Sequence, residues 1–591
     1  MRNRNEIPAE YKWKLTDLFE TPEDWEAQYK ASEAMLPTLA ALKGTLGTSA
    51  ESLYNAYETV DRFWQTFEHV GDYAFLGKAL DGGDTAFLAR SERVSALSSK
   101  AAAALSFFDP ELMAIPEDTL AGFLTYEPLQ KYAHIIEDAT RLRTHVLDEK
   151  SETILAKFGG IRRTPSNTYN IFTNVEMKLP PVIGENGETA ELTAGNFRAF
   201  RESPKKEVRD AAFKAMFGTY GSYIGTFASI YGGAVKQDNL FAELRGYENA
   251  RAASLARSNV PESVYDSLIT AIHSAIPAME KYLDLRRRAL GLDSIDVYDL
   301  YTPMVKDTEW PMPYEEAKRL VLEAVKPLGG EYRDTIARAY RENWIDVYET
   351  PGKESGAFSS GVYGLHPFVK LNYADTLDDA FTLAHELGHS MHSYYSSKTQ
   401  DFANHGYHLV VAEVASTVNE VLLTKYLLSV ETDPRRRACV LNNFLEGFRT
   451  TVFRQTLFAE FEHKAHMAEA AGTPLTADFL NGLYADLEKT YYPNAALRDE
   501  IKYEWAFIPH FYRSFYVYVY ATGFCSAVDI ASRVFETGDA SAYLKFLSTG
   551  GSDYPVNELK IAGVDLTKPD VVASAMKEFE KTVDELAELL K

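Results

Sequence analysis

Apolar residues recur at intervals of three and four along most of this chain, which is the periodicity of helices that bury one face. The repeat is clearest in residues 25–42, 49–77, 261–290 and 571–590, and glycine and proline residues separate such stretches. In the last stretch, Met576, Phe579 and Val583 lie on one apolar stripe. The pattern predicts a mainly α protein.

Strand-like patterns are few. Asn186-Gly187 is a strong two-residue turn signal between residues 178–183 and 189–192, and the prolines beside it would keep this hairpin at an edge. A second candidate is 367–373, where apolar residues alternate with Lys370 and Asn372. We therefore expect a small sheet beside the helices.

The chain length sets the expected domain organisation. With 591 residues, the chain exceeds the size at which one hydrophobic core stops growing, so at least two lobes are expected. We place a boundary near the predicted hairpin. This gives an N-terminal helical domain over residues 1–195 and a second, larger domain over residues 196–591.

Charge and cysteine usage narrow the expected partners. A formal net charge of −24 repels nucleic acid and anionic membranes, so neither is expected to bind. Cys439 and Cys525 form no CxxC pair, which argues against thiolate metal sites and a disulfide framework. The first residues lack an apolar signal core, and no uncharged apolar run has membrane-spanning length. We expect a cytoplasmic protein, and the sequence leaves its oligomeric state open.

Residues 382–389 contain an HExxH motif within a helical pattern. Thr376 and Asp379 have the spacing of a capping box at the start of that helix. His385 and His389 then lie one turn apart on one face, where two imidazoles can bind one tetrahedral zinc ion. The alternative is a surface helix that carries two histidines by chance. The neighbouring leucine and alanine residues predict a buried helix instead, and buried histidines need partners.

A zinc hydrolase usually has three protein ligands and one open position. Residues 409–423 read as a second apolar helix, which presents Glu413 and Glu420 on one face. Two acids on such a helix are unfavourable unless they face a positive charge. One of them is therefore expected to bind the metal and the other to support a ligand. Their spacing does not show which of the two is the metal ligand.

Several motifs resemble the thimet-oligopeptidase superfamily of zinc peptidases, and within it the bacterial oligoendopeptidase F branch. They lie in residues 356–363, 366–368, 385–392, 411–416, 508–512 and 515–523, and the resemblance covers about residues 110–585. In that superfamily the third zinc ligand is the glutamate that matches Glu413. The resemblance therefore implies that Glu413 is the ligand and that Glu420 supports a ligand. The resemblance also implies a two-lobed helical shell around a deep channel.

The expected chemistry is peptide hydrolysis with one Zn²⁺ per chain. A zinc-activated water would attack the scissile carbonyl while Glu386 accepts its proton and passes it to the leaving amine. The resemblance implies that His510 and nearby tyrosines bind the oxyanion. Tyr516 and Tyr520, one turn apart, are favoured over Tyr518, and the alternative for each tyrosine is packing in the core.

The sequence favours a metalloendopeptidase that cuts short peptides internally, with the peptide lying beside the strand at residues 367–373. A dipeptidyl carboxypeptidase is the near alternative, since the superfamily includes such enzymes. A non-catalytic helical protein with a structural zinc site is the more distant one. The presence of Glu386 and the lack of a nearby cysteine ligand oppose it.

Overall fold

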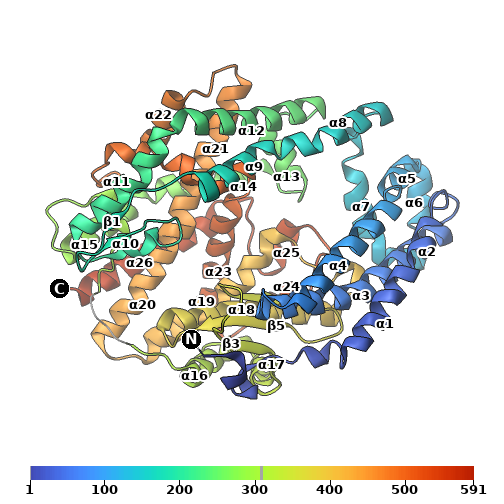
Figure 1. Ribbon diagram of the computed structural model, residues 1–591, viewed down its shortest axis with the longest axis horizontal. Coiled ribbons are helices and arrows are strands. Elements are labelled where there is room, and N and C mark those ends of the chain that lie inside the picture. Colours follow the sequence, from blue (N-terminus) through green and yellow to red (C-terminus); the bar gives the residue numbers. More distant parts are fainter. Residues whose placement is uncertain (1, 306–309) are drawn as a thin grey trace. The chain divides into compact units, whose positions relative to one another are not determined.

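The computed structural model describes residues 2–305 and 310–591 and is mainly α-helical with two small sheets, as predicted (Figure 1). The chain forms two compact units, and each unit combines three separate segments. Unit 1 comprises Met1–Thr144, Trp310–Tyr426 and Ile530–Gly563. Unit 2 comprises His145–Glu309, Leu427–Asp529 and Val564–Lys591. None of the helices in the described part of the chain combines the length and apolar character of a membrane span.

The predicted boundary near residue 195 falls inside unit 2 rather than between the units. The reason is long-range packing, because N-terminal residues share a core with a segment more than three hundred positions later. The rings of Trp13 and Phe368, for example, lie 6.0 Å apart in one buried cluster. The compact units therefore do not follow the order of the sequence, and the division into 1–195 and 196–591 stays a prediction.

Unit 1 contains the larger sheet and the HExxH helix. Its helices and strands are α1 Pro22–Ala34, α2 Leu36–Ala40, α3 Ala50–Leu80, α4 Thr85–Ala104, α5 Phe108–Ala114, α6 Glu117–Phe123, α7 Ala133–Arg141, α16 Tyr314–Ala324, α17 Gly330–Arg341, β3 Ile345–Tyr348, β4 Phe358–Ser360, β5 Phe368–Tyr373, α18 Leu377–Thr399, most of α19 Leu409–Val430, α24 Ser541–Leu547 and α25 Pro555–Ile561.

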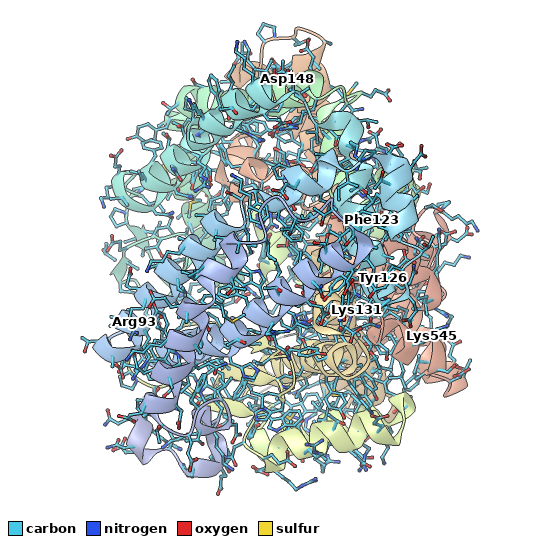
Figure 2. The ribbon with its side chains drawn as sticks, turned by 90° about the vertical axis from the view of Figure 1, so that its right-hand side faces the viewer. Arg93, Phe123, Tyr126, Lys131, Asp148 and Lys545 are labelled. Carbon is cyan, nitrogen blue, oxygen red and sulfur yellow. The ribbon has the colours of Figure 1, made fainter. Side chains whose placement is uncertain are left out.

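The N-terminal helices of unit 1 pack through aromatic side chains. Trp25 is 1% exposed, and its indole nitrogen donates to the Val70 carbonyl over 3.0 Å. At the rim, Arg93 (labelled in Figure 2) pairs with Glu26 at 2.7 Å and stacks over the Tyr29 ring at 4.1 Å. These contacts fix α1, α3 and α4 as one layer.

The larger sheet has the order β3-β5-β4, with β3 parallel and β4 antiparallel to β5. The strand predicted at residues 367–373 is therefore confirmed as β5. It is the central strand, however, and Val369 and Lys370 are paired with both neighbouring strands. The expectation that a peptide pairs with β5 is wrong for these residues, because the outer edges of the described sheet belong to β3 and β4.

The HExxH helix α18 begins as predicted and packs on this sheet. The Thr376 hydroxyl accepts from the Asp379 amide over 3.2 Å, and the Asp379 carboxylate accepts from the Thr376 amide over 3.0 Å. The hydroxyls of Ser390 on α18 and Ser359 on β4 lie 2.8 Å apart. This contact places β4 one turn from Glu386, whose carbonyl accepts from Ser390 over 2.9 Å.

Unit 2 is almost entirely helical. Its helices and strands are α8 Glu149–Arg162, α9 Thr164–Ile171, β1 Val182–Ile183, β2 Thr189–Ala190, α10 Phe197–Glu202, α11 Lys206–Ser222, α12 Ile224–Leu244, α13 Ala250–Ala256, α14 Glu262–Ser274, α15 Ile276–Ala289, α20 Pro434–Gly447, the π-helix η10 Phe448–Phe453, α21 Arg454–Ala470, α22 Ala477–Tyr491, most of α23 Tyr518–Thr537, and α26 Asp570–Leu589. The predicted hairpin is confirmed as β1 and β2, with Val182 opposite Ala190 and a positive φ of 83° at Gly187.

Two helices of unit 1 approach each other closely at Gly388. A Cβ atom there would lie 2.5 Å from the Ala415 carbonyl oxygen and 2.6 Å from the Ser416 Cα on α19. Asn419 of α19 also donates to the Ala384 carbonyl over 3.0 Å. The glycine is thus required by the distance between two backbones, and no flexible side chain can move aside.

We expect Gly388→Ala to destabilise the protein by about 1–3 kcal/mol, because an added methyl group must displace the α19 backbone. The thermal unfolding midpoint measures this effect. Gly71→Ala in α3 is the matched control, since its Cβ would meet Val94 at an ordinary 3.9 Å. Replacing a glycine inside a helix by alanine stabilises the helix when there is space for the methyl group, so the midpoint of this variant should not fall. Equal midpoints for the two variants would contradict the proposed backbone contact.

Candidate active site

His385 and His389 lie one turn apart on α18, with their ring centroids 4.8 Å from each other. The intervening Glu386 is 7% exposed. The helix is buried over most of its surface, as its sequence predicted. The motif therefore presents two imidazoles and a carboxylate within a largely apolar helix.

Glu413 projects from α19 toward both histidines. Its Oε2 atom lies 3.5 Å from His385 Nε2 and 3.8 Å from His389 Nε2. One donor atom from each of the three residues can be chosen so that all lie within 4.8 Å of one another, and no other such group occurs in the described chain. Four-coordinate zinc with bonds of about 2.0–2.2 Å holds its ligand atoms roughly 3.3–3.6 Å apart. The donor set and its spacing therefore fit one zinc ion.

Glu420 meets the other side of His385. Its carboxylate is hydrogen-bonded to His385 Nδ1, and Glu420 follows Glu413 about two turns later on the same face of α19. With Nδ1 carrying the proton, Nε2 presents its lone pair toward Glu413 and the space between the ligands. Glu413 and Glu420 thus occupy different positions, a distinction that their spacing in the sequence left open.

The pKa values of the two histidines and of Glu386 match this arrangement. Burial opposes charge on His385, but the charge and hydrogen bond of Glu420 raise the pKa of His385 to about 9. Burial lowers the pKa of His389 to about 3, and the charge of His385 adds to this effect. Burial and the neighbouring acids raise the pKa of Glu386 to about 7. A metal ion would take the place of the proton on His385 and find His389 already neutral.

Lys370 is a charged neighbour that the alternating strand pattern placed on the polar face. Its side chain is fully buried in β5, and its ammonium donates to the carbonyls of Glu354 and Ser355. Its charge lowers the pKa of Glu386, opposing the burial that raises it. The alternating pattern carries no signal for this placement, because the burial of Lys370 depends on the two strands paired with it and on the elements packed on the sheet.

His510, Tyr516 and Tyr520 come together in unit 2. The ring of Tyr520 lies 6.0 Å from that of His510 and 5.3 Å from that of Tyr516. Arg513 stacks on Tyr516 at 3.9 Å. Burial, with the charges of Arg454 and Arg513, lowers the pKa of His510. The imidazole is therefore neutral at pH 7 and can donate one N–H.

Tyr518 points into the core of unit 2, where its ring packs on Tyr265 at 5.4 Å. Between His510 and the tyrosines Tyr516 and Tyr520, the chain turns sharply at Phe515, which has a positive φ of 58°. A bulky residue in this region stores about 1–3 kcal/mol of strain and is typical of functional segments. The geometry groups the three candidate donors in one unit, and their action beside the metal ligands stays a prediction.

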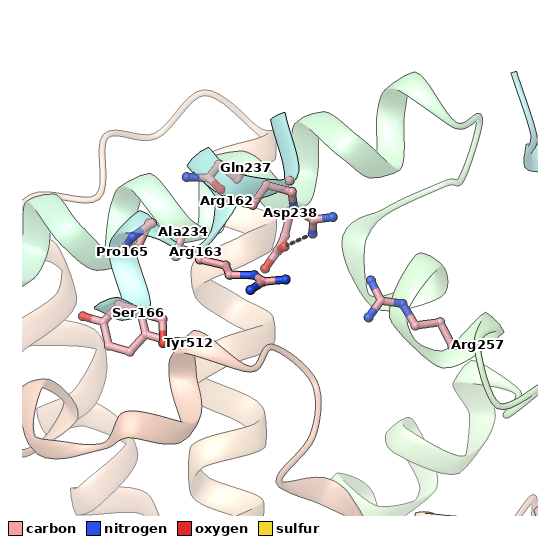
Figure 3. A pocket seen from close by; sticks show the side chains of 10 residues that line it. Arg162, Arg163, Pro165, Ser166, Ala234, Gln237, Asp238, Arg257 and Tyr512 are labelled. Atoms are coloured by element: carbon pink, nitrogen blue, oxygen red, sulfur yellow. Dashed lines mark hydrogen bonds and ion pairs between the residues drawn. The ribbon is translucent and has the colours of Figure 1, made fainter. Parts of the chain in front are cut away.

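The same segment borders a cavity of about 350 Å³ (Figure 3). Its lining includes Tyr512, Arg162, Arg163 and Asp238, with Arg257 projecting from the opposite side. Asp238 is already paired with Arg162 at 3.3 Å, so the lining carries more positive than negative charge. Sequence patterns missed this cavity, because its residues come from four separate segments.

Comparison with known proteins identifies the family. The sequence profile of Peptidase family M3 matches residues 199–578, and that of Oligopeptidase F matches residues 111–178. Oligopeptidase PepF of Bacillus subtilis is 42% identical over 592 residues, which cover all of this chain and 88% of that protein. An oligoendopeptidase F homolog of Lactococcus lactis is 39% identical over 595 residues, covering 100% and 99%.

Solved structures agree with these sequence matches. A crystal structure from Chlamydophila abortus superimposes with a TM-score of 0.94 at 32% identity, and each chain is covered completely. Oligoendopeptidase-F from Enterococcus faecium gives a TM-score of 0.74 at 37% identity over 96% of this chain and 99% of that one. The HExxH helix, the His-His-Glu cluster and these full-length matches lead to one conclusion: the chain belongs to peptidase family M3 and, within it, to the oligopeptidase F group.

Proposed function

We propose that this peptidase is a zinc-dependent endopeptidase that cuts short peptides internally. The observation that carries the proposal is the convergence of His385, His389 and Glu413 directly beside the buried carboxylate of Glu386. Full-length relatives named oligoendopeptidase F support the substrate class. Cys439 and Cys525, which form no disulfide, and the acidic charge fit a reducing cytoplasm.

His385, His389 and Glu413 would hold one zinc ion per chain, and Glu420 would orient His385. Bound zinc supplies Lewis acidity, which lowers the pKa of water and polarises a carbonyl group. Glu386 accepts one proton from the attacking water as the oxygen adds to the carbonyl carbon. It then delivers that proton to the amide nitrogen as the C–N bond breaks. Its burial keeps this proton transfer away from bulk solvent.

The tetrahedral carbon adduct carries negative charge on the former carbonyl oxygen, which requires hydrogen-bond donors. We assign this role to His510 with Tyr516 or Tyr520. They are supported by their mutual packing and by the low pKa of His510, which leaves a neutral N–H donor. The deep channel implied by the family belongs to this proposal as well, since it would select peptides by length.

The unpaired edge of β4 is the proposed docking site for the peptide backbone. A strand edge offers N–H and C=O groups in a row, and an extended peptide can pair with them. Ser359 links this strand to α18 through Ser390, so a peptide held on β4 lies at a fixed distance from Glu386. This replaces the earlier expectation for β5.

We expect Glu413→Ala to lose zinc, because one of three ligands is removed. Glu420→Gln should retain zinc with about 10- to 100-fold weaker affinity, since the orienting carboxylate of a ligand is neutralised. Metal analysis after dialysis against a graded chelator measures both. Glu316→Ala, which removes a partly exposed acid of the same unit, is the control. Retention in Glu413→Ala with loss in Glu420→Ala would reverse the assignment.

We expect Glu386→Gln to keep zinc and to lose about 10²- to 10⁴-fold in turnover, because an amide cannot accept the water proton. The substrates are a pool of peptides of about ten residues and unfolded casein, with cut positions mapped by mass spectrometry. The wild type should cut the short peptides internally, and a zinc chelator should stop it. Near-normal turnover in zinc-loaded Glu386→Gln would exclude the role. Release of C-terminal dipeptides alone would favour the exopeptidase alternative.

We expect His510→Ala to lower kcat by about 10²- to 10³-fold, because one donor to the oxyanion is lost. Steady-state kinetics on one short peptide measure kcat and KM separately. His273→Ala, a partly exposed histidine of the same unit, is the control. An effect confined to KM would assign His510 to substrate binding instead.

A further inference from the structure

Three arginines from distant segments of unit 2 surround Tyr301, the last residue of the short helix η7 Val297–Tyr301. The guanidinium carbon of Arg201 lies 3.6 Å from the Tyr301 ring centroid, and that of Arg449 lies 4.3 Å from it. Arg454 lines the same small cavity, whose volume is about 20 Å³. This space holds one particle of roughly the size of a water molecule.

Two of these arginines are neutralised by carboxylates. Glu446 is shared between Arg449 at 2.7 Å and Arg286 at 2.8 Å. Glu504 pairs with Arg454 at 2.5 Å. One carboxylate therefore serves two guanidinium groups, and the other serves one.

Arg201 has no such partner. Within residues 2–305 and 310–591, no carboxylate lies at ion-pair distance from it, and its buried Nε atom has no hydrogen-bond acceptor. Its guanidinium stacks on the rings of Phe197 and Tyr301 and is hydrogen-bonded to the Tyr301 side chain, while the charge of Glu504 acts on it from beyond ion-pair distance. Burial accordingly lowers the pKa of Arg201, although a guanidinium remains charged at neutral pH.

The remaining carboxylate at the cavity, Glu488, does not supply the missing charge. It is 4% exposed, and burial together with the charge of Glu504 raises its pKa well above the usual range. Burial thus disfavours the ionised form of Glu488. Even with Glu488 counted, the four guanidinium groups of Arg201, Arg286, Arg449 and Arg454 outnumber the three carboxylates of Glu446, Glu488 and Glu504. A buried excess of positive charge is unfavourable unless something compensates it.

Tyr301 compensates only in part. Burial raises its pKa, but Arg454, Arg201 and Arg449 together lower the pKa of Tyr301 to about 8. At pH 7 the phenol is therefore mostly neutral, and the positive excess persists. The cluster is poised to accept one negative charge, either by losing the phenol proton or by taking up an ion.

We propose that this cavity is a binding site for one small monovalent anion of the halide class, held by Arg201, Arg449 and Arg454. The accessible space is that of one small particle, which favours a halide over larger anions such as phosphate. The ion would join α10, η7 and the η10–α21 junction within unit 2. Because Arg454 is one of the charges that lower the pKa of His510, the bound ion would also weaken that effect.

The first test compares the thermal unfolding midpoint of the full-length zinc-loaded protein in sodium chloride and in sodium gluconate at equal ionic strength. A bound ion stabilises the folded state in a saturable way, so the midpoint should rise with chloride and level off. Arg201→Gln should lose this chloride increment. Arg198→Gln is the matched control, because it removes the same charge from the same helix at an exposed position. No chloride increment in the wild type, or a full increment in Arg201→Gln, would overturn the proposal.

The second test separates ion uptake from ionisation of Tyr301. In gluconate, one phenolate should form near pH 8, and Tyr301→Phe should lack it. Chloride should move this titration to higher pH, since the ion already supplies the negative charge. A titration that chloride does not shift would show that the phenolate alone compensates the arginines, which overturns the site.

Should Arg201→Gln fail to fold, bromide replaces the variant as the probe. Wild-type crystals grown in sodium bromide should show one anomalous scattering peak between Arg201 and Arg454. A map with bromide peaks elsewhere and none at this cavity would reject the proposal. This inference does not depend on the peptidase mechanism, so its failure would leave the proposed function intact.

Discussion

The candidate metal centre depends on the close approach of α18 and α19 at Gly388. No side chain separates the two backbones there, because a Cβ atom would lie 2.5 Å from the Ala415 carbonyl. This short distance allows a glutamate on one helix to reach two histidines on the other with an ordinary side-chain length. Tyr332 and Asn419 support the same contact, since the Tyr332 hydroxyl donates to Asn419 over 2.8 Å. A glycine between the two histidines of the motif is therefore a packing requirement as much as a backbone preference.

The second constraint is that polar groups on buried helices need partners. Three glutamates beside this contact receive different environments, although their chemistry is the same. Glu413 faces two imidazole nitrogens, Glu420 accepts from the far nitrogen of one of them, and Glu386 is buried with a raised pKa. Each environment matches the role proposed for it. The same reasoning applies in unit 2. There, Arg201 has no carboxylate at ion-pair distance among the residues that the structure describes, so its positive charge needs a negative charge from another group.

Local sequence patterns predicted what depends on short-range rules. The capping box at Thr376, the hairpin at Gly187, the strand β5 and the pairing of two histidines on α18 all follow from spacings of two to four residues. The helix α19 followed from its apolar run. The predicted site residues are brought together in two groups, one in each unit: the zinc ligands with Glu386, and His510 with the two tyrosines that the resemblance implied. The resemblance to a family, rather than any spacing, connected those two groups to one reaction.

Tertiary features were beyond the reach of such patterns. The alternation of β5 predicts one polar face, but Lys370 is buried because the strand is paired on both sides and covered by α18. For the same reason, the strand proposed to pair with a peptide is β4 rather than β5. The periodicity of one strand does not encode the order of the strands in the sheet. The arginine cluster around Tyr301 combines residues as far apart in the sequence as Arg201 and Arg454, and each arginine alone reads as an ordinary helical cation. Its significance arises only when the charges are counted together, which requires knowing which carboxylates lie near the arginines in the folded chain.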